Sequence, residues 1–448
     1  MSNTLPASNT VNITMIEITK TQKSRSLILA GITSLLLSAC GDSNTKSEEL
    51  PVIAEPEPTP IVNSINNNAG GPDQSQGDCD AVTEGVNWNA LMTETCRNLS
   101  DYNLFEDNMN PTENPTNGGV AFNLAVPLFT DYASKYRFAF IPEGKQINYS
   151  EDEVLDFPVG TVLVKTFTMP ANTADRDGEE LIIETRLLIH RESGWVARPY
   201  YWADTTDAKI AITGKTIEGM TTTHKGELKT FSYSVPKASA CTSCHSVVPL
   251  IQGADDMRQP IFKPIGPKAR NLNIDHVYKD NTANQLQYLS DNQVLIGLPA
   301  DLSTIDKYSQ FSDDDNLETL PHEQVMDTAR AYLDINCAHC HRSELTIPEE
   351  NYAGPAGGSG LQMEYNRDYA ENPQRFGTCK IAVAGGHEDY PADVIPGSPE
   401  SSYLLFRMNT NIQRHRMPEL GRSTIHQEGV ALINYWIKHL PQADCSKP

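Results

Sequence analysis

The pentapeptide Cys-x-x-Cys-His occurs twice in this chain of 448 residues, and no other feature limits its possible folds as strongly. The two copies are Cys241-Thr242-Ser243-Cys244-His245 and Cys337-Ala338-His339-Cys340-His341. This spacing is typical of covalent c-type haem attachment, because two thiolates can add to the haem vinyl groups while the next histidine lies below the iron. The sequence therefore predicts two c-type haems, with His245 and His341 as iron ligands.

Two other interpretations of the cysteine pairs are a zinc site and a thioredoxin-like dithiol. A zinc site would join the two Cys-x-x-Cys units without requiring a histidine after each. A redox dithiol belongs in a βαβ context, which neither motif has. The haem interpretation is therefore preferred.

A low-spin haem iron needs a second axial ligand, and Met417 is the candidate for the second haem. It stands in a loop, Arg416–Gly421, just before the last helical pattern. A thioether is a soft, neutral ligand that favours ferrous iron. Met408 is the rival, although its surroundings read as a core-facing helix.

The second ligand of the first haem is less defined by the sequence. Met257 and His276 rank first, and Met220 and His224 are also conceivable. His339, between the second pair of cysteines, is expected to point outward.

Two cations in the stretch 264–273 can interact with haem propionates. Lys268 and Arg270 are the residues concerned. A solvated charge pair explains them equally well, so both interpretations stay open.

The first forty residues read as a processing segment. Basic residues precede the apolar stretch Leu27–Leu37, which is too short to span a membrane. It ends in Leu37-Ser38-Ala39-Cys40, which resembles a lipoprotein cleavage site with the lipid on Cys40. The alternative is an ordinary export signal with a chance cysteine, and a start at Met15 would give a signal of ordinary length.

An acylated Cys40 would anchor the chain at a bilayer. The next residue is Gly41, which by resemblance to enteric lipoproteins implies a periplasm-facing lipoprotein of the cell envelope, at the outer membrane. The formal net charge of -23 argues against nucleic acid as a partner and permits a basic redox protein, although simple solubility is the preferred explanation of the charge.

Four cysteines remain after haem attachment and lipidation. An even remainder in an oxidising compartment indicates disulfides. We expect Cys79–Cys96 and Cys379–Cys445, because each pair falls within one region of the sequence, but the other two pairings stay open.

The pattern along the chain divides it into five parts. The signal covers residues 1–40, and a polar, Pro-rich and Asn-rich tether covers 41–76. A β-rich domain covers 77–236, with strands expected over 161–168, 181–190 and 195–202. The first haem segment covers 237–320, and a class I cytochrome c-like domain with the second haem covers 321–448.

Helices are expected over 283–298, 323–336 and 429–440, the last two with apolar stripes that would pack across each other. The predicted fold class is α+β multidomain: a β-rich N-terminal domain followed by a mainly α-helical cytochrome c-like haem region.

Several stretches resemble a family of bacterial diheme c-type cytochromes, often lipoproteins. They include Pro127–Phe138, Phe157–Thr161, Glu184–Leu188, Pro264–Asn273 and Tyr332–His341. The resemblance covers roughly residues 100 to 440 and implies exported electron transfer, with both haem motifs intact. It implies no substrate.

The sequence thus predicts an exported, lipid-anchored diheme cytochrome that transfers single electrons to or from redox protein partners. The main alternative is a diheme redox enzyme, peroxidase-like or dehydrogenase-linked, whose first haem has an open coordination site. A third interpretation makes the β-rich region a binding module.

Overall fold

The computed structural model describes residues 77–176, 178–203, 206–249, 260–279, 281–342, 352–383 and 389–446. The chain separates into two compact units, 1–69 and 70–448, and the described residues all belong to the second. The expected signal, tether and lipidation site at Cys40 lie outside the described residues, and so does Met257.

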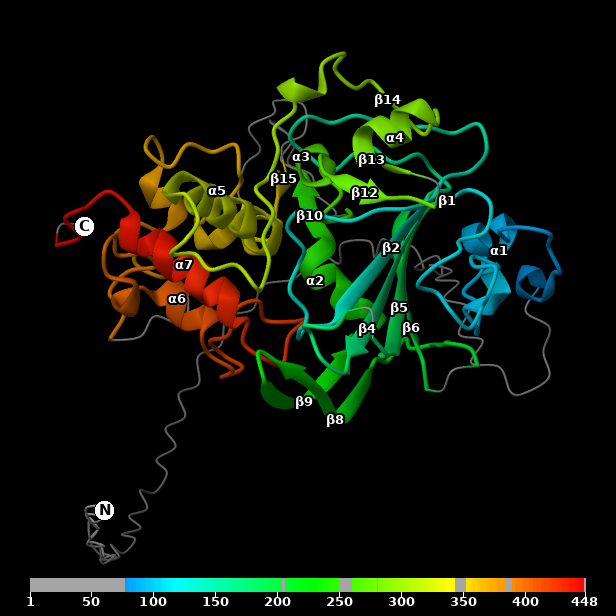
Figure 1. The fold of residues 1–448 in the computed structure, drawn as a ribbon, viewed down its shortest axis with the longest axis horizontal. Coiled ribbons are helices and arrows are strands. Elements are labelled where there is room, and N and C mark those ends of the chain that lie inside the picture. Colours follow the sequence, from blue (N-terminus) through cyan, green and yellow to red (C-terminus); the bar gives the residue numbers. More distant parts are fainter. Residues whose placement is uncertain are drawn as a thin grey trace, which may run out of the picture. The chain divides into compact units, whose positions relative to one another are not determined.

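A six-stranded antiparallel sheet forms the centre of the described unit (Figure 1). Its strands lie in the order β1-β2-β4-β5-β6-β7. Their bounds are Gly119–Ala121 (β1), Ser134–Phe140 (β2), Val162–Pro170 (β4), Glu180–Arg191 (β5), Gly194–Tyr201 (β6) and Lys209–Ile210 (β7). The strands β4, β5 and β6 occupy the regions that β-branched residues predict, and β5 and β6 form a hairpin.

The two faces of this sheet differ because side chains alternate along each strand. One face is apolar, with residues such as Phe138, Val164 and Leu187. It packs against the segment 77–105, which contains α1, Trp88–Thr93. The opposite face is mixed: Leu163 and Leu188 pack there against residues of α3 (Ala269–Leu272) and α4 (Gln285–Asp291), and Lys165 and Arg186 lie beside them.

Short strands and helices make up the remainder. The strands are Ile147–Asn148 (β3), Lys215–His224 (β8), Glu227–Val235 (β9), Ser246–Pro249 (β10), Ile261–Phe262 (β11), Asp275–Val277 (β12), Thr282–Asn284 (β13), Leu295–Ile296 (β14) and Tyr352–Ala353 (β15). The helices are Thr242–His245 (α2), Ala269–Leu272 (α3), Gln285–Asp291 (α4), His322–Leu333 (α5), Tyr403–Met408 (α6) and Gln427–His439 (α7).

The prediction of a mainly α-helical cytochrome c-like region after the β-rich domain is wrong. Beyond residue 236, the described residues form six short α-helices, the longest being the 13 residues of α7, among turns and two-residue to four-residue strands. The apolar stripes over 323–336 and 429–440 do give α5 and α7. The long stretch between them is rich in Gly, Pro, Asn and Asp, which favour turns, and the six-residue α6 is its one α-helix within the described residues.

The expected helix over 283–298 is also shorter than predicted. Only α4 forms there, capped by the Asn284 side chain, which accepts hydrogen bonds from the backbone N–H groups of Leu286 and Gln287. The flanking residues pair as strands β13 and β14 instead. Local capping and pairing therefore limit this helix to two turns.

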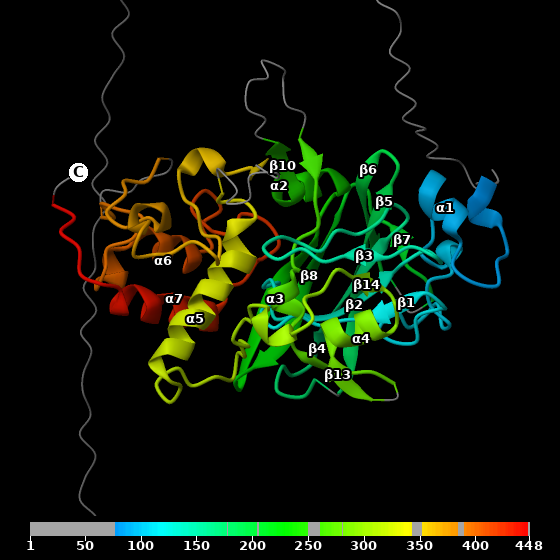
Figure 2. The same ribbon diagram turned by 90° about the horizontal axis from the view of Figure 1, so that it is seen from above.

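Helices α5 and α7 pack together around a core that includes Val325, Leu333, Ile433 and Trp436. They lie with α6 on the same side of the sheet in both ribbon views (Figures 1 and 2). The turn after α5 is π-helical, Asp334–Ala338, and leads directly into the second Cys-x-x-Cys-His motif. The α5–α7 pair thus positions that motif.

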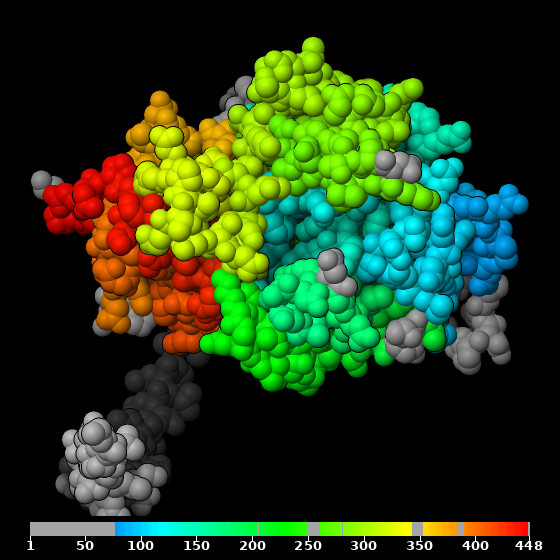
Figure 3. Space-filling view, viewed as in Figure 1, coloured from blue at the N-terminus to red at the C-terminus, as the bar shows by residue number. Residues whose placement is uncertain are grey.

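The β8–β9 hairpin contacts the C-terminal segment, and the space-filling view shows the green hairpin against red and orange residues (Figure 3). Glu428 on α7 bonds His224 at 3.0 Å and Lys225 at 2.8 Å. Among the described residues, no helix is both long and apolar enough to cross a bilayer.

The structure contains both disulfide pairs expected from the sequence. Cys79 is bonded to Cys96, and Cys379 to Cys445. The four cysteines of the two Cys-x-x-Cys-His motifs are free thiols.

Candidate functional site

The first motif is a single helical turn. A 3-10 turn, Ala238–Cys241, runs into α2, which ends at His245 because Ser246 is extended and starts β10. Residues three apart lie on the same side of such a turn, so Cys241 and Cys244 face together. Burial raises the pKa of the Cys241 thiol, while Arg186 on the sheet acts in the opposite direction.

The second motif is a turn held by backbone bonds. The N–H groups of Cys340 and His341 both donate to the carbonyl of Cys337, at 3.1 and 2.9 Å. Burial, followed by the charge of Asp334, raises the pKa of the Cys337 thiol to about 12. Burial thus favours the protonated thiol at Cys241 and Cys337, whereas hydrogen bonds from Cys340 and His339 lower the pKa of Cys244. None of the four motif cysteines is in a disulfide, so each sulfur is available for a thioether.

The two motifs contact each other. Cys340 Sγ lies 3.8 Å from the carbonyl oxygen of Ser243, and its thiol is hydrogen-bonded to that of Cys244, which raises the pKa of Cys340. The ligand atoms of Cys244, His339 and Cys340 all lie within 4.8 Å of one another. Groups attached to the two motifs would therefore be immediate neighbours.

Each proximal-ligand candidate opens onto its own cavity. The first cavity, together with the open solvent at its mouth, has about 890 Å³ of empty space, and its walls include Cys244 and His245. The second, counted in the same way with its open solvent, has about 1300 Å³, and its walls include Cys337, Cys340 and His341. Cys244 and His339 line both cavities, so the spaces adjoin at the contact between the motifs.

His245 and His341 are both neutral, and each has one ring nitrogen in a hydrogen bond. His245 Nδ1 donates to the carbonyl oxygen of Lys263 at 2.7 Å, and His341 Nδ1 is hydrogen-bonded to Ser359 Oγ at 2.9 Å. Burial lowers the pKa of each to about 4. A fixed Nδ1 orients the ring and leaves Nε2, which has no hydrogen-bond partner among the described residues, for a metal.

The structure brings Met417 to the second cavity, together with Met408 and Met363. Arg422 holds this loop: its guanidinium donates to the carbonyl oxygens of Met417 at 3.1 Å and Met408 at 3.3 Å. It also donates to the carbonyl of Thr410 at 2.9 Å. One buried cation thus fixes the backbone of both candidate ligands.

Three of the four sequence candidates for the sixth ligand at the first motif lie within the described residues, and none of them is at the first cavity; the fourth, Met257, is outside the described residues. His276 on β12 lies beside Asn123 and Tyr278. Met220 is a residue of β8 whose side chain lies in a buried apolar cluster, and His224 is hydrogen-bonded to Glu428. None of these three lines either cavity.

The expectation that His339 points outward is wrong. It lies where the cavities adjoin, and its Nδ1 is buried without a hydrogen-bond partner. The reason is that the contact with Cys244 covers the turn that the sequence alone presents as exposed.

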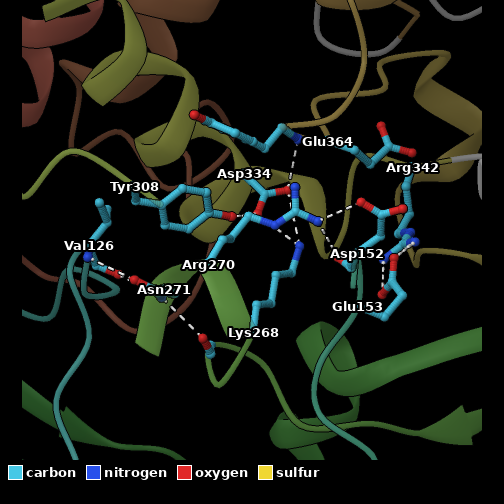
Figure 4. Close-up of polar contacts among 12 residues, drawn as sticks. Val126, Asp152, Glu153, Lys268, Arg270, Asn271, Tyr308, Asp334, Arg342 and Glu364 are labelled. Atoms are coloured by element: carbon cyan, nitrogen blue, oxygen red, sulfur yellow. Dashed lines mark hydrogen bonds and ion pairs between the residues drawn. The ribbon is translucent and has the colours of Figure 1, made fainter. Parts of the chain in front are cut away.

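Lys268 and Arg270 belong to a buried network of charges (Figure 4). Lys268 pairs with Asp334 at 2.8 Å, and Arg270 pairs with Asp152 at 2.9 Å. Lys268 lines the first cavity, whereas Arg270 is not in either wall. Neither is a solvated charge pair, because both side chains are almost fully buried.

A row of cations crosses the sheet beside the first motif. Arg137, Lys165 and Arg186 are direct cross-strand neighbours on β2, β4 and β5. Arg186 pairs with Glu184, but Arg137 and Lys165 have no ion-pair partner within the described ranges. Burial, followed by the neighbouring arginines, lowers the pKa of Lys165 well below its usual value. Like charges in such a row destabilise a sheet unless an anion lies against them.

These residues fit a haem at each motif. The free thiols, the neutral histidines and the adjoining cavities supply the attachment and ligation. In the wall of the first cavity, Arg342 Nε is a buried donor without a hydrogen-bond partner, which suits a haem carboxylate. Arg137 Nη2 in the cation row is a second such donor, although it is in the wall of neither cavity.

Comparison with known proteins gives no match: no family model, curated protein or solved structure corresponds to this chain.

Proposed function

We propose that this protein is a diheme c-type cytochrome that transfers single electrons. The first haem is held by Cys241, Cys244 and His245, and the second by Cys337, Cys340 and His341. The observation that carries the proposal is that each motif presents a neutral, oriented imidazole to its own cavity, while the motifs touch.

Bound haem iron supplies one-electron chemistry between its ferric and ferrous states. The residues of the chain would orient the ligands, neutralise the haem carboxylates and keep the two sites close together. The Lys263 carbonyl keeps the proton on Nδ1 of His245, and the Ser359 hydroxyl, which can donate or accept, orients the ring of His341. The cation row and Arg342 can neutralise carboxylates, and the contact between Cys244 and Cys340 keeps the two sites adjacent, so that an electron can pass within the molecule.

The proposal extends to the location and partners of the protein. Haem attachment of this type belongs to exported proteins, so we propose a periplasm-facing position with a lipid anchor on Cys40. The net charge of -23 suits a redox protein with a basic docking surface.

The test is the mass of the full chain produced in a host with working cytochrome maturation. We expect two covalently attached haems per chain. In Cys241→Ala, the first haem should keep a single thioether, which shifts its reduced absorption band, while the second haem is unchanged. A wild-type mass that equals polypeptide plus lipid would contradict the proposal.

A zinc site is the second candidate, because the structure places Cys244, His339 and Cys340 around one point. The variant His339→Ala separates the two functions. Haem attachment predicts two haems in this variant, as in the wild type, since His339 is not a haem ligand. A zinc site predicts one bound zinc per wild-type chain and its loss in the variant, measured by elemental analysis.

A further inference from the structure

A second histidine, His190, faces the first cavity together with His245. It lies near the end of β5, directly across from Trp195 on β6. It shares the sheet face of Arg186, because side chains at alternate positions of a strand point the same way. The first motif covers this face, since the turn before Cys241 packs on β6.

The ring of His190 is held in the same manner as that of His245. His190 Nδ1 donates to the carbonyl oxygen of Phe157 at 2.8 Å, and the ring stacks on Trp195 with centroids 4.5 Å apart and planes 7° apart. The ring of His245 stacks on Phe262 at 4.8 Å and 4°. A carbonyl oxygen only accepts, so both Nδ1 atoms carry the proton.

The remaining nitrogen, His190 Nε2, has no hydrogen-bond partner within the described residues. A histidine that served only to pack the sheet would gain from bonding both ring nitrogens, as His224 does with Thr173 and Glu428. A carbonyl on Nδ1 and an open Nε2 are the features of a histidine prepared for a metal.

We propose that His190 is the sixth ligand of the first haem iron, opposite His245. This inference rests on the proposed diheme function and completes it, because the described candidates from the sequence, His276, Met220 and His224, are not at this cavity. The first haem is then low-spin with two imidazole ligands. A methionine raises the potential of a haem relative to a second histidine, so the first haem has the lower potential if the second has a methionine ligand.

The test is near-infrared magnetic circular dichroism and EPR of the ferric, full-length holoprotein, with haem content measured on the same sample. We expect the wild type to show one bis-histidine low-spin haem. In His190→Ala, that signal should be lost and replaced by a high-spin haem that binds cyanide, while the second haem is unchanged. Added imidazole should restore the low-spin signal.

His276→Ala is the matched control, because His276 is the histidine that the sequence favours and it lies outside the cavity. We expect its spectra to equal those of the wild type. A bis-histidine signal that survives His190→Ala, or a wild-type first haem that is high-spin or methionine-ligated, would overturn the assignment of His190.

The wild-type spectrum tests the ligation even if the variant does not fold. A wild-type high-spin first haem would instead favour the diheme enzyme with an open site. A chain with no covalent haem would defeat the proposed function itself, and the haem measurement reports that outcome separately.

Discussion

At the residue scale, three methionines share the cavity of His341 but differ in burial. Met363 and Met408 are almost fully buried in the α5–α7 core, while Met417 is half-buried on a loop. A core methionine fills space, whereas a partly exposed one held by a backbone clamp is free to coordinate. The Arg422 bonds provide that clamp.

We therefore predict different effects for Met417→Ala and Met408→Ala. Met417→Ala should abolish the methionine-to-iron charge-transfer band and lower the potential of the second haem by on the order of 0.1 V, within the span of about 0.8 V that axial ligands control. Met408→Ala should keep the band and lower the free energy of unfolding by about 2–5 kcal/mol. Loss of the band in Met408→Ala alone would reverse the assignment.

At the element scale, α5 and its π-helical turn are tied through Asp334 to the start of α3 and to Tyr308. This carboxylate accepts hydrogen bonds from Lys268 at 2.8 and 3.1 Å and from the hydroxyl of Tyr308, and Figure 4 shows them converging. Burial alone would raise its pKa, but Lys268 and Arg270 outweigh burial and lower the pKa to about 2. The charge network thus fixes the segment that carries the second motif.

We predict that Asp334→Asn lowers the free energy of unfolding by about 3–5 kcal/mol, because it leaves Lys268 buried without its counterion. The folded pKa of about 2 lies below the ordinary 3.8, so the carboxylate stabilises the fold above about pH 4 and loses this effect as the pH falls toward 2. Denaturant titrations of both proteins at pH 7 and pH 3 should show the difference shrink. A pH-independent difference would contradict this account.

The sequence predicted the helices and strands that have a clear pattern of apolar or β-branched residues within their own length. The apolar stripes of α5 and α7 and the β-branched runs of β4 and β5 are visible in the sequence. The sequence overestimated the amount of helix after residue 236. Residues that favour turns are frequent there, and their conformation depends on contacts with residues distant in the sequence. His190 was missed for the same reason: within its strand it is one more sheet residue, and only the packing of the first motif over that face brings it to a cavity.

At the scale of the whole molecule, two disulfides restrain distant parts of the chain. Cys79–Cys96 closes a loop of 17 residues in the N-terminal segment, and Cys379–Cys445 closes one of 66 residues around α6 and α7. A cross-link stabilises mainly by limiting the unfolded chain, and the effect grows slowly with loop length.

We predict that replacing either pair with serines lowers the free energy of unfolding by about 2–5 kcal/mol. The Cys379/Cys445 variant should be the less stable of the two by about 1 kcal/mol, since its loop is longer. Equilibrium denaturation of the two variants, each with an unaltered haem content, measures this difference. The reverse order would mean that the native contacts around each bridge, rather than chain entropy, set the effect.

The contact between Cys244 and Cys340 also constrains the timing of biosynthesis. On the proposed function, an assembly enzyme must reach both sulfurs before the two motifs come together, because in the folded chain the two thiols are hydrogen-bonded to each other. A chain that folds before haem attachment would stay without haem, and its neighbouring thiols could then oxidise to a disulfide. Haem attachment must therefore precede folding. When haem is added to the refolded polypeptide that lacks it, the mass of the polypeptide should not increase.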